Sequence, residues 1–169
     1  ETAVEMQAGQ TFALAGLFAL SGCLGEPKTS TMQSPMTCLA FRLTPGTDLK
    51  QALQQRINEE GIAAATVVSA VGSLTDYQLR FANQDTAGTG SGHFEITSLV
   101  GTLSQNGSHL HMTIADEAGR CISGHLLDGN RIYTTAEIVI GVLPALEFTR
   151  EPDSLSGYRE LVVRKKSKK

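Results

Sequence analysis

Apolar residues follow two different spacings along the chain. Most segments alternate apolar and polar residues or form short, wholly apolar runs, and both patterns are typical of β-strands. Residues 37–43 predict a first strand, which Pro45 and Gly46 end. Further strands are predicted for residues 62–71, 74–82, 93–105, 131–142, 145–150 and 158–163, and a hairpin for residues 108–127.

One segment, about residues 48–60, instead has helical spacing. Its apolar stripe consists of Leu49, Ala52, Leu53 and Ile57. Thr47 is the expected N-cap, Asp48 suits the first turn, and Gly61 is expected to end the helix. This is the principal amphipathic helix that the sequence predicts.

Glycine-rich positions predict breaks between strands. Gly72 is expected to provide a tight turn or a close backbone approach before the strand resumes at Leu74. No nucleophile-elbow motif surrounds Ser73, so a nucleophilic role is not favoured. Residues 88–92, GTGSG, are expected to form a hairpin loop. A strand-like segment follows them, where a phosphate-binding loop needs a helix N-terminus.

The dipeptide Asn106-Gly107 is a strong signal for a two-residue turn. It predicts that Gln105 pairs with Ser108. That register sets Thr102 opposite His111.

Three of the four histidines lie within residues 108–127. His109 and His111 are two apart, so on a strand both imidazoles lie on one face. Residues 116–119 supply a turn. If His125 faces His111 or His109, the loop holds about five residues and all three rings share a face. If Ala115 pairs with Arg120, His125 turns to the apolar side.

Three neutral imidazoles that converge would form an open site for zinc or another divalent metal, with His109, His111 and His125 as ligands. The alternative is that they line a solvated sheet face. Glu95, within an otherwise apolar strand, is the candidate catalytic acid/base or an outer-shell partner of the metal. It is equally compatible with an ion pair to Arg80 or Arg131.

Composition narrows the classes of function. The chain has 169 residues, a net charge of -3 and no Trp, which is not the composition of a basic or base-stacking nucleic-acid binder. Cys23, Cys38 and Cys121 have no CxxC spacing. An odd set of this kind indicates reduced thiols and an intracellular protein. The chain is expected to be cytoplasmic or nuclear and to have no membrane partner.

The two ends differ from the central segment. Residues 1–35 are expected to be a variable or disordered extension. An apolar run there ends at Cys23 like a lipoprotein box, but no Lys or Arg precedes Lys28, so a signal peptide or lipoprotein is the weaker interpretation. Residues 164–169 are expected to be a basic, disordered tail: a nuclear address, a weak nucleic-acid contact or a solubilising end.

The phrases FRLTPGTDLKQAL, GIAAATVVSAVGSL, GHFEITSLVGTL, HLHMTIADEAGRCISGHLL and TAEIVIG occur in order within residues 36–163. In these phrases the chain resembles the PPC domain family, named for plants and prokaryotes. The resemblance implies an α+β fold: a strongly curved, mainly antiparallel sheet with one principal helix, similar to acetolactate decarboxylase. It also implies a homotrimer and a candidate DNA-binding role.

The chain lacks the Arg-Gly-Arg-Pro hook of plant members, which contacts the minor groove. Its three hairpin histidines resemble the metal-binding histidines of prokaryotic members. Two hypotheses follow. One is a homotrimeric regulatory module with a metal site that contacts proteins or DNA. The other is a zinc-dependent lyase or hydrolase acting on a small oxoacid, carbonyl or ester substrate.

Overall fold

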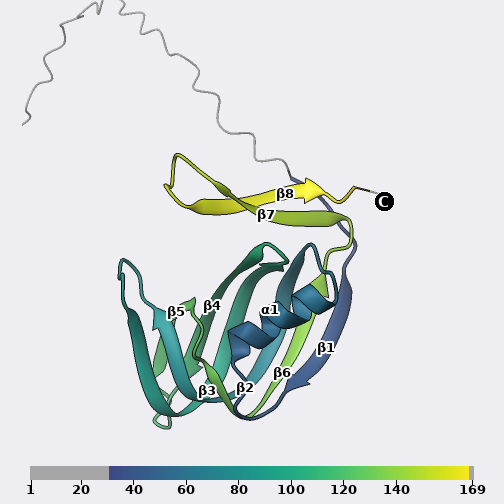
Figure 1. Cartoon of the computed structure of the whole chain (residues 1–169). Coiled ribbons are helices and arrows are strands. Elements are labelled where there is room, and N and C mark those ends of the chain that lie inside the picture. The colour runs from purple at the N-terminus through teal and green to yellow at the C-terminus, as the bar shows by residue number, and fades with distance from the viewer. Residues whose placement is uncertain (1–30, 168–169) are drawn as a thin grey trace, which may run out of the picture.

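The computed structural model describes residues 31–167. Most of the predicted N-terminal extension, including the lipoprotein-like box at Cys23, and the last two residues of the predicted tail lie outside this range. The elements, shown in Figure 1, are β1 (Thr37–Leu43), α1 (Leu49–Glu59), β2 (Ala65–Arg80), β3 (Ala87–Ser104), β4 (Gly107–Ala115), β5 (Cys121–Leu126), β6 (Arg131–Val142), β7 (Leu146–Pro152) and β8 (Arg159–Lys165).

Six strands form one antiparallel sheet in the order β1-β6-β2-β3-β4-β5. On one side, β2 pairs with β6 as far as Asp76 and then with β5, through Leu79–Leu126 and Arg80–His125. Because β5 also pairs with β4, the strands β2, β3, β4 and β5 close into a ring at that end. The curved sheet wraps around α1 (Figure 1), as the α+β prediction expected.

The junction between β5 and β6 is fixed by a fully buried amide. Asn130 accepts a hydrogen bond from the Gln78 backbone N–H (3.1 Å) and donates to the carbonyls of Gln78 (3.2 Å) and Leu127 (2.6 Å). The side chain thus continues the pairing of β2 where β6 leaves it. A buried amide with all its groups bonded stabilises one local arrangement against others.

The helix forms as predicted except at its first turn. The N-cap is Asp48, whose carboxylate accepts from the Gln51 backbone N–H at 3.0 Å, so the expectation for Thr47 is wrong by one residue. Asp48 also accepts from the Gly129 N–H, which ties the start of α1 to the β5–β6 connection. The apolar stripe is confirmed, since Leu49, Leu53 and Ile57 are fully buried.

The predicted break at Gly72 is wrong, because β2 runs through it. The alternative expectation, a close backbone approach, is confirmed: Gly72 has φ +149°, and a Cβ there would lie 2.1 Å from the Thr135 carbonyl oxygen. The predicted loop at residues 88–92 is also wrong, because these residues belong to β3. Cβ atoms at Gly88 and Gly90 would meet the rings of Phe81 and Tyr77, so here glycine makes room for aromatic side chains.

The turn between β3 and β4 is displaced from its predicted position. Ser104 pairs with Gly107, so His109 faces Thr102 and His111 faces Val100. The buried Ser104 hydroxyl accepts from the Asn106 N–H (3.1 Å) and donates to the Gly107 carbonyl (3.2 Å), which favours this register. The register differs from the predicted one by two residues, and therefore leaves each side chain on its predicted face.

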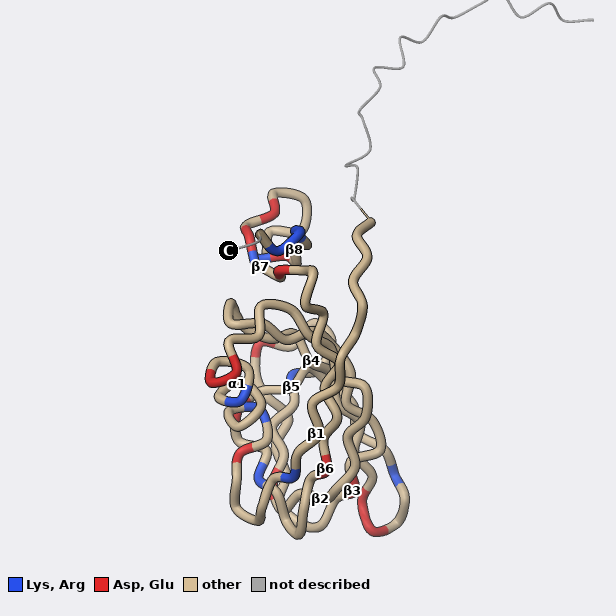
Figure 2. The backbone as a smooth tube through the Cα atoms, turned by 90° about the vertical axis from the view of Figure 1, so that its right-hand side faces the viewer, with Lys and Arg blue, Asp and Glu red and all other residues tan. Residues whose placement is uncertain are grey.

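Strands β7 and β8 form a separate two-stranded sheet. The hairpin lies across the upper end of the curved sheet (Figures 1 and 2), where Leu146 and Phe148 pack with Ala64 in a second small core. The Phe148 N–H donates to the Ala63 carbonyl at 3.0 Å. β8 extends through Lys165, so the first two residues of the predicted basic tail are strand.

Within residues 31–167, no helix has the length and apolar character needed to span a bilayer, since α1 has only 11 residues.

Gly72→Ala is expected to lower the free energy of unfolding by roughly 3 kcal/mol or more, because the new methyl group overlaps the β6 backbone. Gly46→Ala is the matched control: its φ is also positive, at +80°, but no atom lies within 4 Å of the position that its new methyl group would take. The control is expected to cost about 1–2 kcal/mol. Urea unfolding at equilibrium measures both, and equal losses would contradict the close-approach account.

Candidate metal centre

The alternating residues of β4 give the strand one buried face and one exposed face. Leu110, Met112 and Ile114 are buried in the main core, so the residues between them point away from it. His109 and His111 are exposed on that opposite face. The prediction that both imidazoles share one side of a strand is confirmed.

A five-residue loop, residues 116–120, brings the third histidine to the same face. Ala115 pairs with Cys121 and His111 with His125, so the alternative pairing of Ala115 with Arg120 is excluded. Asp116 organises the loop by accepting hydrogen bonds from the backbone N–H groups of Ala118 and Arg120, both at 2.9 Å. The Arg120 side chain also donates to Asp116, at 2.8 Å.

Gly101 fixes the other side of the histidine strand. It has φ +136°, and a Cβ there would lie 2.0 Å from the His109 carbonyl oxygen. Glycine at this position therefore lets the backbone of β3 approach β4 directly beside His109. The next residue, Thr102, faces His109 across the pair and accepts a hydrogen bond from Arg150 of β7 at 2.9 Å.

The three imidazoles converge. The Nε2 atoms of His109 and His111 are 3.3 Å apart, and one ring nitrogen from each histidine lies within 4.8 Å of those of the other two. Ring centroids are 5.1 Å apart for His109–His111 and His109–His125, and 5.6 Å for His111–His125. Two nitrogens bound to tetrahedral zinc at about 2.05 Å lie about 3.3 Å apart. The geometry therefore fits a divalent ion with small side-chain adjustments.

The surroundings of the cluster favour the neutral form of two of its imidazoles, those of His125 and His109. Burial is the largest cause that lowers the pKa of His125 to about 4, and the nearby His109 and Arg80 are the next largest. Burial, followed by Arg150, also lowers the pKa of His109. Neutral imidazole is the form that binds a metal ion. Nδ1 of His125 is buried and has no hydrogen-bond partner among the described residues.

Two small, open cavities share His111 and Val100 among their lining residues. One, of about 330 Å³, is lined by His109, Arg150 and Glu160 among others. The other, of about 390 Å³, includes His125 and Arg80. Thus the described structure places an arginine in each cavity beside the histidines.

Glu95, the candidate acid/base, lies elsewhere on the sheet. It is exposed, faces Ser73 and Ala115 on the neighbouring strands, and forms no ion pair with Arg80 or Arg131 within the described residues. Ala115 is four residues from His111, so Glu95 is displaced roughly 13 Å along the strand from the cluster. The structure does not bring Glu95 to the histidines.

Two residues of the β7–β8 hairpin lie beside the cluster, and no pattern in the sequence predicted this. Arg150 and Glu160 lie on strands that mix polar and apolar residues. Only the return of the chain over the sheet places these two side chains beside His109. The sequence suggested Arg80 only as a partner of Glu95, but its pairing with His125 follows from the closure of β2 against β5.

Comparison with known proteins places this geometry in a family. The family model of the Plants and Prokaryotes Conserved (PCC) domain matches residues 30–144. The chain belongs to this family. The match includes all three histidines but ends before the β7–β8 hairpin. The predicted resemblance is therefore confirmed.

A curated relative, the bifunctional protein GlmU of Synechococcus sp. (strain JA-3-3Ab), is 45% identical over 145 residues, which are 86% of this chain and 23% of that protein. The chain therefore spans about a quarter of the length of this relative. A hypothetical protein from Salmonella enterica has a solved structure that is 39% identical, with a TM-score of 0.79, over 80% of this chain and 99% of that one.

Two more distant structures share the fold. A metal-containing protein from Archaeoglobus fulgidus is 22% identical, with a TM-score of 0.68, over 79% of this chain and 99% of that one. A Bacteroides thetaiotaomicron protein, whose name proposes DNA binding, is 21% identical, with a TM-score of 0.66, over 76% of this chain and 96% of that one.

Asp116→Asn is expected to loosen the loop that sets His125 opposite His111. Hydrogen bonds from the Arg120 and Ala118 backbone, with the Arg120 side chain, hold the pKa of Asp116 below its usual range. Its stabilising contribution is therefore present above about pH 4 and is lost as the pH falls through the lowered pKa. We expect faster amide hydrogen exchange in β4 and β5 of the variant. Glu117→Gln, in the same loop, is the control and should leave exchange unchanged.

Proposed function

We propose that this chain is a PCC-domain module that binds a divalent metal ion, zinc in the first place, through His109, His111 and His125. The supporting observation is the convergence of three ring nitrogens within 4.8 Å of one another on one face of the β4–β5 hairpin. Three neutral nitrogen ligands leave a fourth position of tetrahedral zinc open. The Archaeoglobus fulgidus relative, which is named a metal-containing protein, supports the same assignment.

The scaffold of the site also supports binding. Asp116 and Gly101 fix the strands on either side of the histidines, so little rearrangement is needed when the ion enters. A bound zinc ion would act as a Lewis acid towards an oxygen of a ligand in the open position. The role of the chain's own residues is to hold the ion and to shape the cavities beside it.

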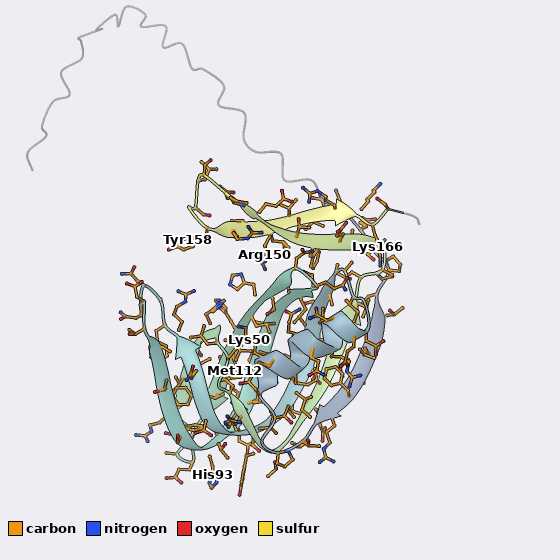
Figure 3. All side chains as sticks on the ribbon, viewed as in Figure 1. Lys50, His93, Met112, Arg150, Tyr158 and Lys166 are labelled. Atoms are coloured by element: carbon orange, nitrogen blue, oxygen red, sulfur yellow. The ribbon has the colours of Figure 1, made fainter. Side chains whose placement is uncertain are left out.

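His125→Ala is expected to weaken zinc binding by about 100-fold or more, because it removes a direct ligand. His93→Ala is the matched control: His93 stacks on Tyr133, at the end of the molecule opposite the β7–β8 hairpin (Figure 3). Zinc at one hundred times its Kd should raise the free energy of unfolding of the wild type by about 2.7 kcal/mol. Competition with a chromogenic chelator gives the affinities, and thermal unfolding gives the stabilisation.

Two results would contradict the metal assignment. One is a wild-type protein that, purified without chelator and then supplied with zinc, retains none. The other is an equal loss of affinity in the His93 and His125 variants, since only His125 belongs to the cluster.

We propose in addition that the module is a homotrimer. The proposal comes from the family resemblance, and the outer face of the sheet supports it: Val68 and Val71 are each more than half exposed there. Apolar side chains gathered on one face favour an interface. Sedimentation equilibrium tests this, because a trimer has about three times the 18.0 kDa mass of the chain.

Direct DNA binding is the second candidate function, supported by the name of the Bacteroides thetaiotaomicron relative. The charge pattern opposes it, since Lys and Arg are interspersed with Asp and Glu (Figure 2) and the net charge is -3. Binding through phosphate contacts would weaken linearly in a plot of log K against log salt. We expect no retarded DNA in a gel-shift assay even at low salt. If a retarded species appeared, and its binding weakened steeply as the salt concentration rose, DNA binding would become the first candidate function.

The zinc-enzyme alternative needs a proton-transfer group beside the metal. Glu95 is displaced roughly 13 Å along the strand from His111. Glu160 lines the cavity that contains His109 and His111, so of the two carboxylates it is the better placed for such a role.

A further inference from the structure

The surroundings of the histidine cluster indicate the charge of what binds there. Arg150 lines one adjoining cavity and Arg80 the other, and Glu160 is the only acidic residue that lines either of them in the described part of the chain. Neither arginine has a carboxylate within 4.0 Å among the described residues. One carboxylate only partly balances two arginines, and the net positive charge, beside the proposed divalent cation, favours an anionic ligand.

A hydrogen bond holds the side chain of Arg150 in place. Its Nη2 donates to Thr102 at 2.9 Å, and Thr102 faces His109 across the β3–β4 pair. Figure 3 shows Arg150 on the side of the β7–β8 hairpin that faces the sheet. A guanidinium has five N–H donors, and the Thr102 hydroxyl occupies one of them, so others are left for a ligand.

The size and lining of the cavities indicate a small ligand. Their volumes, about 330 and 390 Å³, are at the lower end of the range for small-molecule sites. Val100 borders both cavities and Leu161 borders the one with Arg150, so short apolar groups have contacts there. Glu160 beside Arg150 reduces the local positive charge, which favours a monoanion over a dianion.

We propose that the site binds a short-chain carboxylate, with the carboxylate on Arg150 and a second oxygen on the metal held by His109, His111 and His125. The inference rests on the proposed metal site and adds the class of ligand to it. Arginine suits the task because its planar fork matches the two oxygens of a carboxylate. Arg150 here is a ligand-binding residue and takes no part in holding the metal.

Cobalt(II)-loaded protein provides a readout that does not depend on activity, because a ligand that enters the coordination sphere changes the visible absorption of the ion. The probe is pyruvate, a 2-oxo acid with one carboxylate and a methyl group. Inorganic phosphate and the uncharged amide of pyruvic acid are the comparison ligands. Cobalt affinity is measured first, in every variant.

Arg150→Gln is expected to bind cobalt like the wild type and to bind pyruvate roughly tenfold more weakly or worse, because a charge-assisted hydrogen bond is lost. Arg164→Gln is the matched control on the same hairpin: it breaks the ion pair with Glu151 and lines neither cavity. Its pyruvate affinity should remain that of the wild type. The uncharged amide should bind more weakly than pyruvate to the wild type only.

The outcomes separate the two proposals. Cobalt binding with equal pyruvate affinity in the wild type and the Arg150 variant overturns the carboxylate inference and leaves the metal site standing. Phosphate binding tighter than pyruvate, with the same dependence on Arg150, overturns the choice of a monoanionic carboxylate. Absence of cobalt binding to the wild type overturns the proposed function, and the inference with it.

Discussion

The pairing of β4 with its two neighbours is the constraint on which the candidate site depends. Leu110, Met112 and Ile114 must face the core, and the alternation of a strand then forces His109 and His111 to the other side. The loop closed by Asp116 sets His125 opposite His111, and a shift of one residue would turn that ring inward. Burial of ordinary aliphatic side chains therefore positions the polar ones.

The closure of the sheet also brings a charged residue beside the histidines. Because β6 leaves β2 after Asp76, the freed edge of β2 is available to β5, and this pairing puts Arg80 directly opposite His125. The buried amide of Asn130 completes the hydrogen bonds at the point of exchange. The histidines thus lie beside two arginines from different parts of the fold, one from the closed sheet and one from the β7–β8 hairpin.

Local patterns in the sequence were sufficient for much of the fold. The first strand and the strand at residues 131–142 have the predicted bounds, and the five-residue loop brings three histidines to one face as its spacing indicated.

Glycine was the main source of error. Gly72, Gly88 and Gly90 were interpreted as breaks or a loop, but each lies within a strand and accommodates a neighbouring backbone or ring. Such contacts are tertiary, so periodicity does not reveal them. For the same reason the sequence favoured Glu95 and missed Arg150, whose approach to His109 depends on how a separate hairpin lies over the sheet.

The boundary of the family match has a consequence for how such a module can diversify. The three histidines and the strands that carry them fall inside residues 30–144, whereas Arg150 and Glu160 follow that boundary, on the β7–β8 hairpin. The hairpin touches the sheet through a small core of its own. The histidine cluster and the charged residues beside it thus lie on separately packed parts of the chain, so substitutions in the hairpin can change those charges without disturbing the pairing of β4 with β5.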